Sequence, residues 1–384
     1  MTSSCGEHHI RVADVFEGRW PDRTPLCEQV IPSSVATEIL GREAFTGSSA
    51  LRYQEALSWL RSDQAHAEFV EQVFEDAVAV HRALDLDILF LPGVGMQKPT
   101  KQIDDCTLLF GDPDTDNWNL YTFDQDSQQF GVLKSGTPPL NVEQVVAQMR
   151  ATIAGYDPAA QPARLTPFQE RAVAECADEF VIGGSSFMIV PMQPGWLEAS
   201  LLEPQLVAEH LDVVVERNLA SMALQRQNGI WLFNGGGDFA YNRGPVYSPQ
   251  FFEEIMAPRW KRLFDWCREN DAKYVFRSDG NLWPVADSLF GWANPHAYYE
   301  IDRDAGMQLD KLRARFPELV LMGSISCDVL QRGTPEDVKE QTLACLEAAA
   351  PRCIIASANS ILHGTPLDNL AAMYETAKSY RPRG

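Results

Sequence analysis

Short, continuous apolar runs alternate along the chain with longer stretches in which apolar residues recur at helical spacing. Continuous apolar runs are typical of parallel strands buried on both faces, whereas a half-exposed antiparallel strand would alternate apolar and polar residues. The runs that we expect to be strands are 25–30, 87–91, 179–183, 230–234, 273–277, 297–301, 319–323 and 353–357. Eight strands with intervening helices are what a closed (β/α)8 barrel requires, so the pattern predicts an α/β protein with a TIM-barrel fold.

Helix start signals support this alternation. Ser248 suits the N-cap and Pro249 the first turn of the amphipathic helix 249–267, and Pro258 is expected to kink that helix. Residues 334–337 (TPED) open another helix, with acidic side chains in the first turn, where the helix dipole favours them.

Two stretches are additional to a bare barrel. Residues 1–85 have a mainly helical pattern and are expected to form an N-terminal helical extension that packs on one end of the barrel. Residues 97–136 are polar with short alternating pieces, which predicts a β-hairpin insertion over the barrel mouth. We expect one domain spanning residues 1–384, although length alone also permits two.

The charge balance narrows the classes of partner. The chain has 32 basic and 53 acidic residues, a formal net charge of −21 that would repel phosphate backbones and anionic lipids. Neither nucleic acid nor a membrane is therefore an expected partner, and no apolar run is long enough to predict a membrane span. The N-terminus does not have the pattern of a secretory signal, and the 8 cysteines contain no CxxC pair, so we expect reduced thiols and a cytoplasmic protein.

Three carboxylates come at the ends of consecutive predicted strands, where barrels of this kind carry their functional side chains. They are Asp238, Asp279 and Glu300, and Arg277 lies close to Asp279 in the sequence. Carboxylates gathered at one mouth can coordinate a metal ion, exchange protons or bind a cationic ligand; taken singly, each could equally cap a helix or pair with an arginine. The occurrence of three carboxylates at consecutive strand ends favours a functional site. If a metal ion is bound there, these three residues are its candidate ligands.

Other strand-end residues give weaker signals. His363 is the only histidine directly after a predicted strand end and is a candidate catalytic group, although a single histidine is more often structural. Gly235–Gly237 could let the backbone approach a ligand closely or could form a plain turn, and it lacks the spacing of a dinucleotide-binding fingerprint. No cysteine near a strand end has a neighbouring base in the sequence, so nothing favours nucleophilic catalysis.

The segment 234–373 resembles the C-terminal half of the uroporphyrinogen decarboxylase and corrinoid methyltransferase superfamily. The motifs that carry the resemblance are, in order, Asp238 with Gly244-Pro245 and Ser248-Pro249, Ser278-Asp279-Gly280-Asn281, Glu300 with Leu309-x-x-Leu312, Gly323-Ser324-Ile325, 333–338 (GTPEDV) and Thr365-Pro366-x-x-Asn369. The N-terminal half matches loosely, through Asp22-Arg23-x-Pro25 and the strand at 87–91. The superfamily folds as a (β/α)8 barrel, in agreement with the strand count.

The sequence departs from the decarboxylases of this superfamily at their signatures. Their arginine-rich MRQAGR-like stretch, which holds the substrate carboxylates, is absent from residues 1–60. Their Phe-Ser-Asp appears here as Phe90-Leu91-Pro92, and residues 188–196 stand roughly where they carry Pro-Trp-Thr-Leu. Haem-pathway decarboxylation is therefore poorly supported.

The methyltransferases of the superfamily give a closer match. Those that bind zinc use a His-x-Cys pair and a distant Cys, and the matching positions here are Arg277, Asp279 and Asn359, so a zinc site is not implied. Enzymes that pass a methyl group to a corrinoid protein often show His-Ser-Asp-Gly-Asn. Residues 277–281 (RSDGN) match that stretch except at Arg277, a fixed cation.

The resemblance thus implies a demethylating methyltransferase, which moves a methyl group from a small methylated compound to the corrinoid of a partner protein. Asp279 and Glu300 would orient or protonate the leaving group, and Arg277 would pair with an anionic group. The remaining predicted site residues are Asp238, Asn281 and Asn359, which would bind substrate, and His363, a further catalytic candidate beside them.

The corrinoid would belong to the partner, because this chain lacks the DxHxxG-type stretch of a cobalamin-binding module. The sequence assigns no cofactor to this chain, leaves open whether it binds a metal ion, and is compatible with a homodimer. Two alternatives remain open at this stage. One is decarboxylation of a tetrapyrrole or another carboxylated ring, and the other is a non-catalytic barrel that binds a small molecule.

Overall fold

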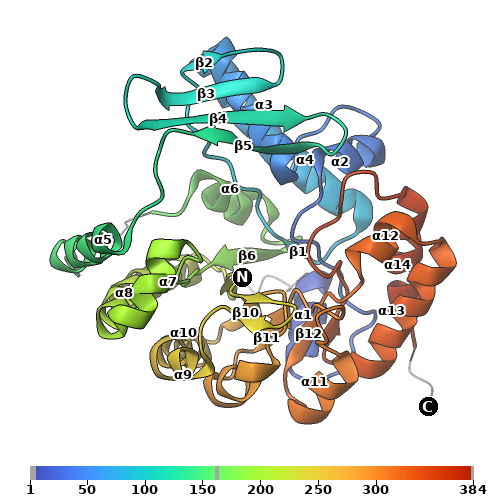
Figure 1. Cartoon of the computed structure of the whole chain (residues 1–384). Coiled ribbons are helices and arrows are strands. Elements are labelled where there is room, and N and C mark those ends of the chain that lie inside the picture. The colour runs from blue at the N-terminus through green and yellow to red at the C-terminus, as the bar shows by residue number, and fades with distance from the viewer. Residues whose placement is uncertain (1–5, 161–163, 382–384) are drawn as a thin grey trace.

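A parallel sheet of seven strands forms the centre of the molecule (Figure 1). The computed structural model describes residues 6–160 and 164–381. The strands follow the order β1-β6-β7-β10-β11-β12-β13 and comprise β1 (Ile88–Leu89), β6 (Val181–Ser185), β7 (Leu232–Gly236), β10 (Lys273–Arg277), β11 (Ala297–Tyr299), β12 (Val320–Met322) and β13 (Cys353–Ile354). Each coincides with or overlaps an apolar run that the sequence predicts as a strand.

Residues 25–27, from the first predicted strand, join the two edges of this sheet. Leu26 forms a parallel bridge to Ile355, and Cys27 forms one to Ile88. The N–H of Cys27 donates to the carbonyl of Ile355 at 3.1 Å, and the N–H of Asp87 donates to the carbonyl of Leu26 at 2.8 Å. The strands therefore close into the (β/α)8 barrel that the count of apolar runs predicts.

Helices cover the outside of the barrel. Between and after the strands they are α5 (Val142–Ala154), α6 (Pro167–Cys176), α7 (Pro194–Leu202), α8 (Pro204–Gln227), α9 (Pro249–Phe251), α10 (Ala257–Glu269), α11 (Leu309–Arg315), α12 (Cys327–Arg332), α13 (Pro335–Ala349) and α14 (Leu367–Ser379). Shorter elements are the two-stranded β8 (Ala240–Tyr241) with β9 (Gly244–Pro245), and the turns η2 (Trp283–Val285) and η3 (Asp287–Ala293).

The predicted helix starts are present. The hydroxyl of Ser248 accepts from the N–H of Phe251 at 3.1 Å, and Thr334 forms a capping box with Asp337. The disturbance expected at Pro258 takes the form of a π-helical turn, η1 (Phe252–Met256), directly before α10. Because proline has no N–H to donate, the regular hydrogen-bond ladder cannot continue unchanged through this point.

The N-terminal region contains the described helices α1 (Glu7–Phe16), α2 (Ser33–Leu40), α3 (Ser48–Arg61) and α4 (Asp63–Leu84). Of these, α1 closes one end of the barrel. Val12, Val15 and Phe16 of α1 pack in the same buried cluster as interior side chains of the strands, among them Ile88 and Ile354. The end at which the strands finish is the one left for a site, as barrels of this type use it.

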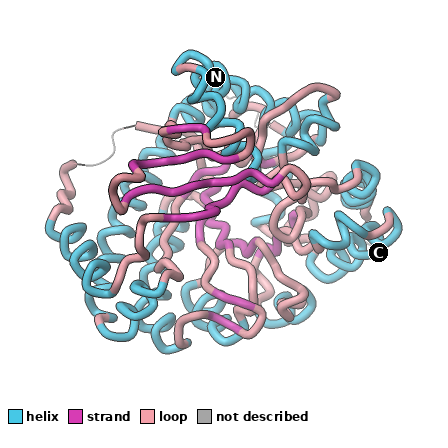
Figure 2. The backbone as a smooth tube through the Cα atoms, turned by 45° about the horizontal axis from the view of Figure 1, so that its top comes forward, coloured by secondary structure: helices cyan, strands magenta, loops and turns pink. Residues whose placement is uncertain are grey.

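The insertion predicted as a hairpin is a larger antiparallel sheet (Figures 1 and 2). Its strands are β2 (Lys101–Gln102), β3 (Thr107–Asp112), β4 (Asn117–Asp124) and β5 (Gln129–Ser135), in that order. The sheet packs on α3, where Tyr53 stacks on Phe123 with ring centroids 4.2 Å apart. The sequence located the insertion but underestimated its strands, because a polar pair such as 101–102 carries no apolar signal.

Two further observations bear on the expectations from composition. Among the described residues, no helix is long and apolar enough to cross a membrane. The cysteines in this part of the chain are free thiols, and most are buried; Cys5 lies outside the described residues.

Candidate active site

Arg277 is the last residue of β10 and lies between the ends of two neighbouring strands. In the sheet register it is paired with Gly236 of β7 on one side and Tyr299 of β11 on the other. A Cβ atom on Gly236 would lie 1.9 Å from the carbonyl oxygen of Arg277, and the φ angle of Gly236 is +141°. Glycine is therefore required here because it lets the two strands approach closely at the barrel mouth.

The guanidinium of Arg277 connects three strand ends. Its Nη1 donates to Oδ1 of Asn234 at 3.1 Å, and its Nε lies 3.5 Å from Oε1 of Glu300. The same oxygen of Glu300 accepts from Nε2 of Gln29 at 2.7 Å. Below the guanidinium is the ring of Phe187, 5.6 Å from its central carbon, a distance at which a cation is attracted to an aromatic face.

Glu300 is a buried carboxyl group whose pKa lies near neutrality. Burial is the main cause and raises its pKa to about 7, while Arg277 and Gln29 act in the opposite direction and Asp238 and Asp279 add to the rise. The backbone of Glu300 is left-handed, with φ of +66°, a conformation that non-glycine residues rarely adopt. Such strain persists where the surrounding structure imposes it, often at a functional site.

Asp279 is the second carboxylate at this end of the barrel. It accepts from Nδ2 of Asn359 at 3.1 Å, a contact that lowers its pKa. Burial raises the pKa of Asp279 more strongly, and the charges of Asp238 and Asp302 add to that rise, so the net shift is upward. Several carboxylates therefore lie close together at the barrel mouth, and their mutual repulsion favours the protonated forms of Asp279 and Glu300.

A third carboxyl group with a raised pKa, Glu28, lies directly after the strand segment 25–27. Its oxygens accept from the backbone N–H and the hydroxyl of Ser357, at 3.1 and 2.6 Å, and from the hydroxyl of Tyr374 at 3.0 Å. These bonds lower the pKa, but full burial outweighs them and raises it to about 7. Glu28 ties the first strand to the loop after β13 and to α14.

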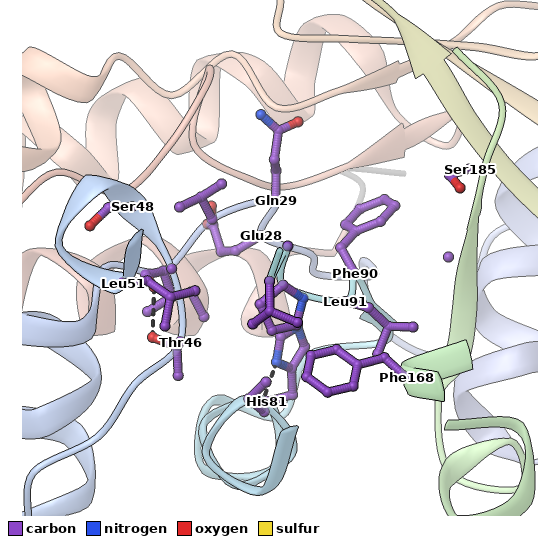
Figure 3. A pocket seen from close by; sticks show the side chains of 18 of the residues that line it. Glu28, Gln29, Thr46, Ser48, Leu51, His81, Phe90, Leu91, Phe168 and Ser185 are labelled. Atoms are coloured by element: carbon purple, nitrogen blue, oxygen red, sulfur yellow. Dashed lines mark hydrogen bonds between the residues drawn. The ribbon is translucent and has the colours of Figure 1, made fainter. Parts of the chain in front are cut away.

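A cavity of about 660 Å³ opens beside these groups, and we refer to it as the mouth cavity. Strand ends contribute Gln29, Asn234 and Arg277, and the opposite walls come from α4 and from the start of α6. Figure 3 shows the inner part, with Phe90, Leu91 and Phe168 forming apolar walls. The N-terminal residues of α3 also line the cavity, so the antiparallel sheet supports that wall from behind without lining it.

All the predicted site residues lie within the described part of the chain, but only some of them come together at the barrel mouth. Arg277, Glu300, Asp279 and Asn359 meet at the barrel mouth, and of the predicted residues Arg277 alone lines the mouth cavity. Asp238 is exposed and near enough to affect the pKa values of both buried carboxyl groups.

Neither Asn281 nor His363 lines the mouth cavity. The side-chain oxygen of Asn281 accepts from the N–H of Trp283 at 3.0 Å, which makes it a turn former. Nδ1 of His363 lies 2.8 Å from the hydroxyl of Ser34.

The carboxylates at the mouth do not form a metal site. Within the described residues, no group of three or more His, Cys, Asp or Glu side chains is placed so that it could hold a metal ion. The positions that match the zinc ligands of related methyltransferases carry Arg277, Asp279 and Asn359, and the guanidinium of Arg277 is engaged with Asn234. A cation with five donors and no acceptor cannot replace a ligand, so these residues do not fit zinc.

The lining residues that were not predicted as site residues include the polar residues Glu28, Gln29, His81 and Asn234. Glu28, Gln29 and Asn234 lie at the ends of predicted strands, so the strand-end rule could have selected them. His81 lies on the inner face of α4 and lines the mouth cavity. No sequence signal distinguishes it from an ordinary buried helix residue.

The closed barrel makes this a TIM-barrel protein. Its buried carboxyl groups and its arginine mark the strand ends as the candidate site. The model of the family Uroporphyrinogen decarboxylase (URO-D) matches residues 186–380, just over half of the 384 residues. The chain belongs to this family, which confirms the resemblance read from the motifs.

A solved structure supports the same fold. A methyltransferase from Methanosarcina mazei is similar to this chain with a TM-score of 0.63 and 15% sequence identity, over 96% of this chain and 97% of that one. At this identity the likeness concerns the fold. A search of curated proteins found no match.

Proposed function

We propose that this protein is a methyltransferase that removes a methyl group from a small methylated compound and passes it to the corrinoid of a partner protein. The observation that carries the proposal is the contact between Arg277, which lines the mouth cavity, and Glu300, whose Oε1 lies 3.5 Å from Nε of Arg277. A fixed cation and a carboxyl group that holds its proton near neutral pH can bind an anionic substrate and protonate a leaving group at the same place.

Each residue at the mouth has a part in this proposal. Arg277 pairs with an anionic group of the substrate, and its position is fixed by Asn234 and by the face of Phe187. Glu300 donates its proton to the heteroatom from which the methyl group leaves, so that this heteroatom leaves protonated and uncharged, and Glu300 then regains a proton from water. A reduced corrinoid supplies the nucleophile that accepts the methyl group.

The outer edge of the cavity supports access by a partner. Phe187 and Ile189, in the loop after β6, are 47% and 46% exposed, and Ile189 lies against the glycine turn at Gly237. Exposed apolar side chains beside a site are typical of a surface that another protein covers.

Decarboxylation of a tetrapyrrole is less well supported. Phe90, Leu91 and Pro92 occupy the place of the decarboxylases' Phe-Ser-Asp and line the mouth cavity. That wall is apolar here, and it offers no carboxylate to a pyrrole nitrogen.

The test is incubation of the purified protein with cob(I)alamin and a panel of methyl thioethers, methylamines and methyl aryl ethers, each with and without a carboxylate. We expect absorbance of the methylated corrinoid to appear with a carboxylate-bearing donor. Arg277→Met should weaken use of that donor at least about tenfold, whereas Arg315→Met, which removes an exposed arginine paired with Asp287, should behave as the wild type.

Two other results would replace the proposal. Loss of CO2 from uroporphyrinogen, with no methylated corrinoid from any donor, would identify a decarboxylase. Tight binding of a panel compound without turnover in either assay would identify a binding barrel.

A further inference from the structure

Three buried polar atoms on residues lining the mouth cavity have no hydrogen-bond partner. They are Oε1 of Gln29, Nε2 of His81 and Nε of Arg277, which has an ion-pair contact with Glu300 at 3.5 Å but no hydrogen bond. Buried polar atoms in folded proteins are nearly always paired, because an unpaired one has lost its bonds to water without replacement. Three such atoms around one cavity indicate the polar pattern of what fills it: an acceptor or anion at Arg277, and donors at the other two.

The state of His81 follows from its surroundings. Nδ1 lies 2.7 Å from the carbonyl oxygen of Ala77, one turn earlier on α4. A carbonyl accepts and cannot donate, so Nδ1 carries the hydrogen and Nε2 presents its lone pair. The side chain is 5% exposed, and burial lowers its pKa to about 4, which keeps the ring neutral at pH 7.

The position of His81 makes Nε2 an acceptor for a ligand. Figure 3 shows the ring standing on α4 and directed into the cavity, with Phe168 beside it and Glu28 and Gln29 on the opposite wall. The nearby lining from Leu91 and Phe168 is apolar and offers no donor to the ring. An acceptor held by the helix in one tautomer, inside apolar walls, selects strongly for an O–H or N–H group.

We propose that the mouth cavity binds a small carboxylate whose body is apolar and ring-sized and whose far end carries a hydroxyl or N–H group that donates to Nε2 of His81. The carboxylate pairs with Arg277, an assignment that rests on the proposed function; the subsite at His81 is new. The methyl group to be transferred is then on a heteroatom near Glu300, and the donor at the inner end fixes the orientation of the substrate.

The experiment measures binding and needs neither a corrinoid nor turnover. Dissociation constants are determined by calorimetry for para-hydroxybenzoate, para-hydroxyphenylacetate and para-hydroxyphenylpropanoate, each against its partner without the hydroxyl group. We expect at least one pair in which the hydroxyl improves affinity about tenfold, as one buried hydrogen bond would. In His81→Phe that preference should vanish, while the compound without the hydroxyl group keeps its affinity for the protein within about threefold.

A second measurement does not depend on the variant folding. With ¹⁵N-labelled histidine, the Nε2 resonance of His81 should shift when the hydroxylated probe binds and stay in place with its partner. The seven histidines of the chain make assignment by single substitutions practicable.

Two results would overturn the subsite: an undiminished hydroxyl preference in His81→Phe, or no hydroxyl preference in any pair for the wild type. The two proposals can fail separately. Methyl transfer that is indifferent to His81→Phe would leave the function standing without the subsite. A hydroxyl preference that depends on His81, with no methyl transfer, would support the subsite and contradict the proposed function.

Discussion

Nε of Arg277 lies 3.5 Å from Oε1 of Glu300, and burial still raises the pKa of that carboxyl group to about 7. An exposed arginine–glutamate pair would hold the glutamate ionised through the whole physiological range. Here the loss of water from a nearly fully buried carboxyl group outweighs the arginine, and the neighbouring carboxylates add to the effect. Glu300 can therefore donate a proton at neutral pH while Arg277 keeps its charge.

The first prediction concerns the role of Glu300 as a proton donor. The rate of methyl transfer should fall as pH rises through about 7, because the carboxyl group loses the proton that it must donate. Glu300→Gln should lower the rate about 100-fold or more and remove this decline, since an amide does not titrate. The measurement is the pH–rate profile of both proteins, and a decline of the same shape in Glu300→Gln would assign the titration to another group.

The second prediction links Glu28 to the pH dependence of stability. Burial raises the pKa of Glu28 from its ordinary value of 4.5 to about 7, so the folded chain holds this proton more tightly than the unfolded chain does. The resulting stabilisation is complete below about pH 4.5 and is lost as pH rises through 7, a change on the order of 3 kcal/mol. In Glu28→Gln the free energy of unfolding should decline less between pH 5 and pH 8.

Urea unfolding at several pH values measures this difference. Glu347→Gln, which neutralises an exposed glutamate, serves as the control and should follow the wild type at every pH. Parallel curves for Glu28→Gln and the wild type would mean that Glu28 is ionised in the folded protein throughout this range.

The third prediction concerns the hydrogen bond between Asn359 and Asp279. Nδ2 of Asn359 donates to the Asp279 carboxylate at 3.1 Å and favours its charged form. Asn359→Ala should therefore raise the pKa of Asp279 further. Carbon-13 NMR titration of labelled aspartate, with the Asp279 signal assigned through Asp279→Asn, measures the change. Asn228→Ala, which removes an exposed side chain bonded to the Leu224 carbonyl, should leave the signal unaltered, and an unmoved Asp279 in Asn359→Ala would show that the contact does not exist in solution.

The fourth prediction concerns Gly235, near the end of β7. A Cβ atom on Gly235 would lie 1.8 Å from the carbonyl oxygen of Ser186 and 2.2 Å from the hydroxyl of Tyr274. Both neighbours are buried, and one is backbone, so Gly235→Ala should lower the free energy of unfolding by about 3 kcal/mol or more. Gly131→Ala, in the antiparallel sheet, meets no atom within 4 Å and should change stability little. Equal denaturation midpoints for the two variants would contradict the close packing at the mouth.

The barrel could be predicted from the sequence because each of its strands has its own local signal, and that signal recurs along the chain. Each strand is a continuous apolar run, and burial on both faces leaves no polar alternation to confuse the pattern. The insertion was harder to predict, since the strand at 101–102 is exposed and polar and pairs with its neighbour through backbone atoms.

The sequence could predict those parts of the candidate site whose position follows directly from the end of a strand. Arg277 and Asp279 lie at the end of β10 and Glu300 directly follows the neighbouring β11, so the topology brings these residues close together. Side-chain direction beyond the strand end is not determined in this way, which is why Asn281 forms a turn and His363 bonds to Ser34. His81 could not be predicted at all, because its importance depends on a tautomer and on a cavity formed by segments far apart in the sequence.

The measurement that tests methyl transfer at the barrel mouth most directly is a single turnover with a carboxylate-bearing, ¹³C-methyl-labelled donor and cob(I)alamin. It compares the wild type with Asp279→Asn and Glu300→Gln, after circular dichroism has shown that all three are folded. We predict that the label appears on the corrinoid with the wild type and that both variants are slower, Glu300→Gln by about 100-fold or more. Full activity in both variants, or no labelled corrinoid from any donor with the wild type, would contradict methyl transfer at this site.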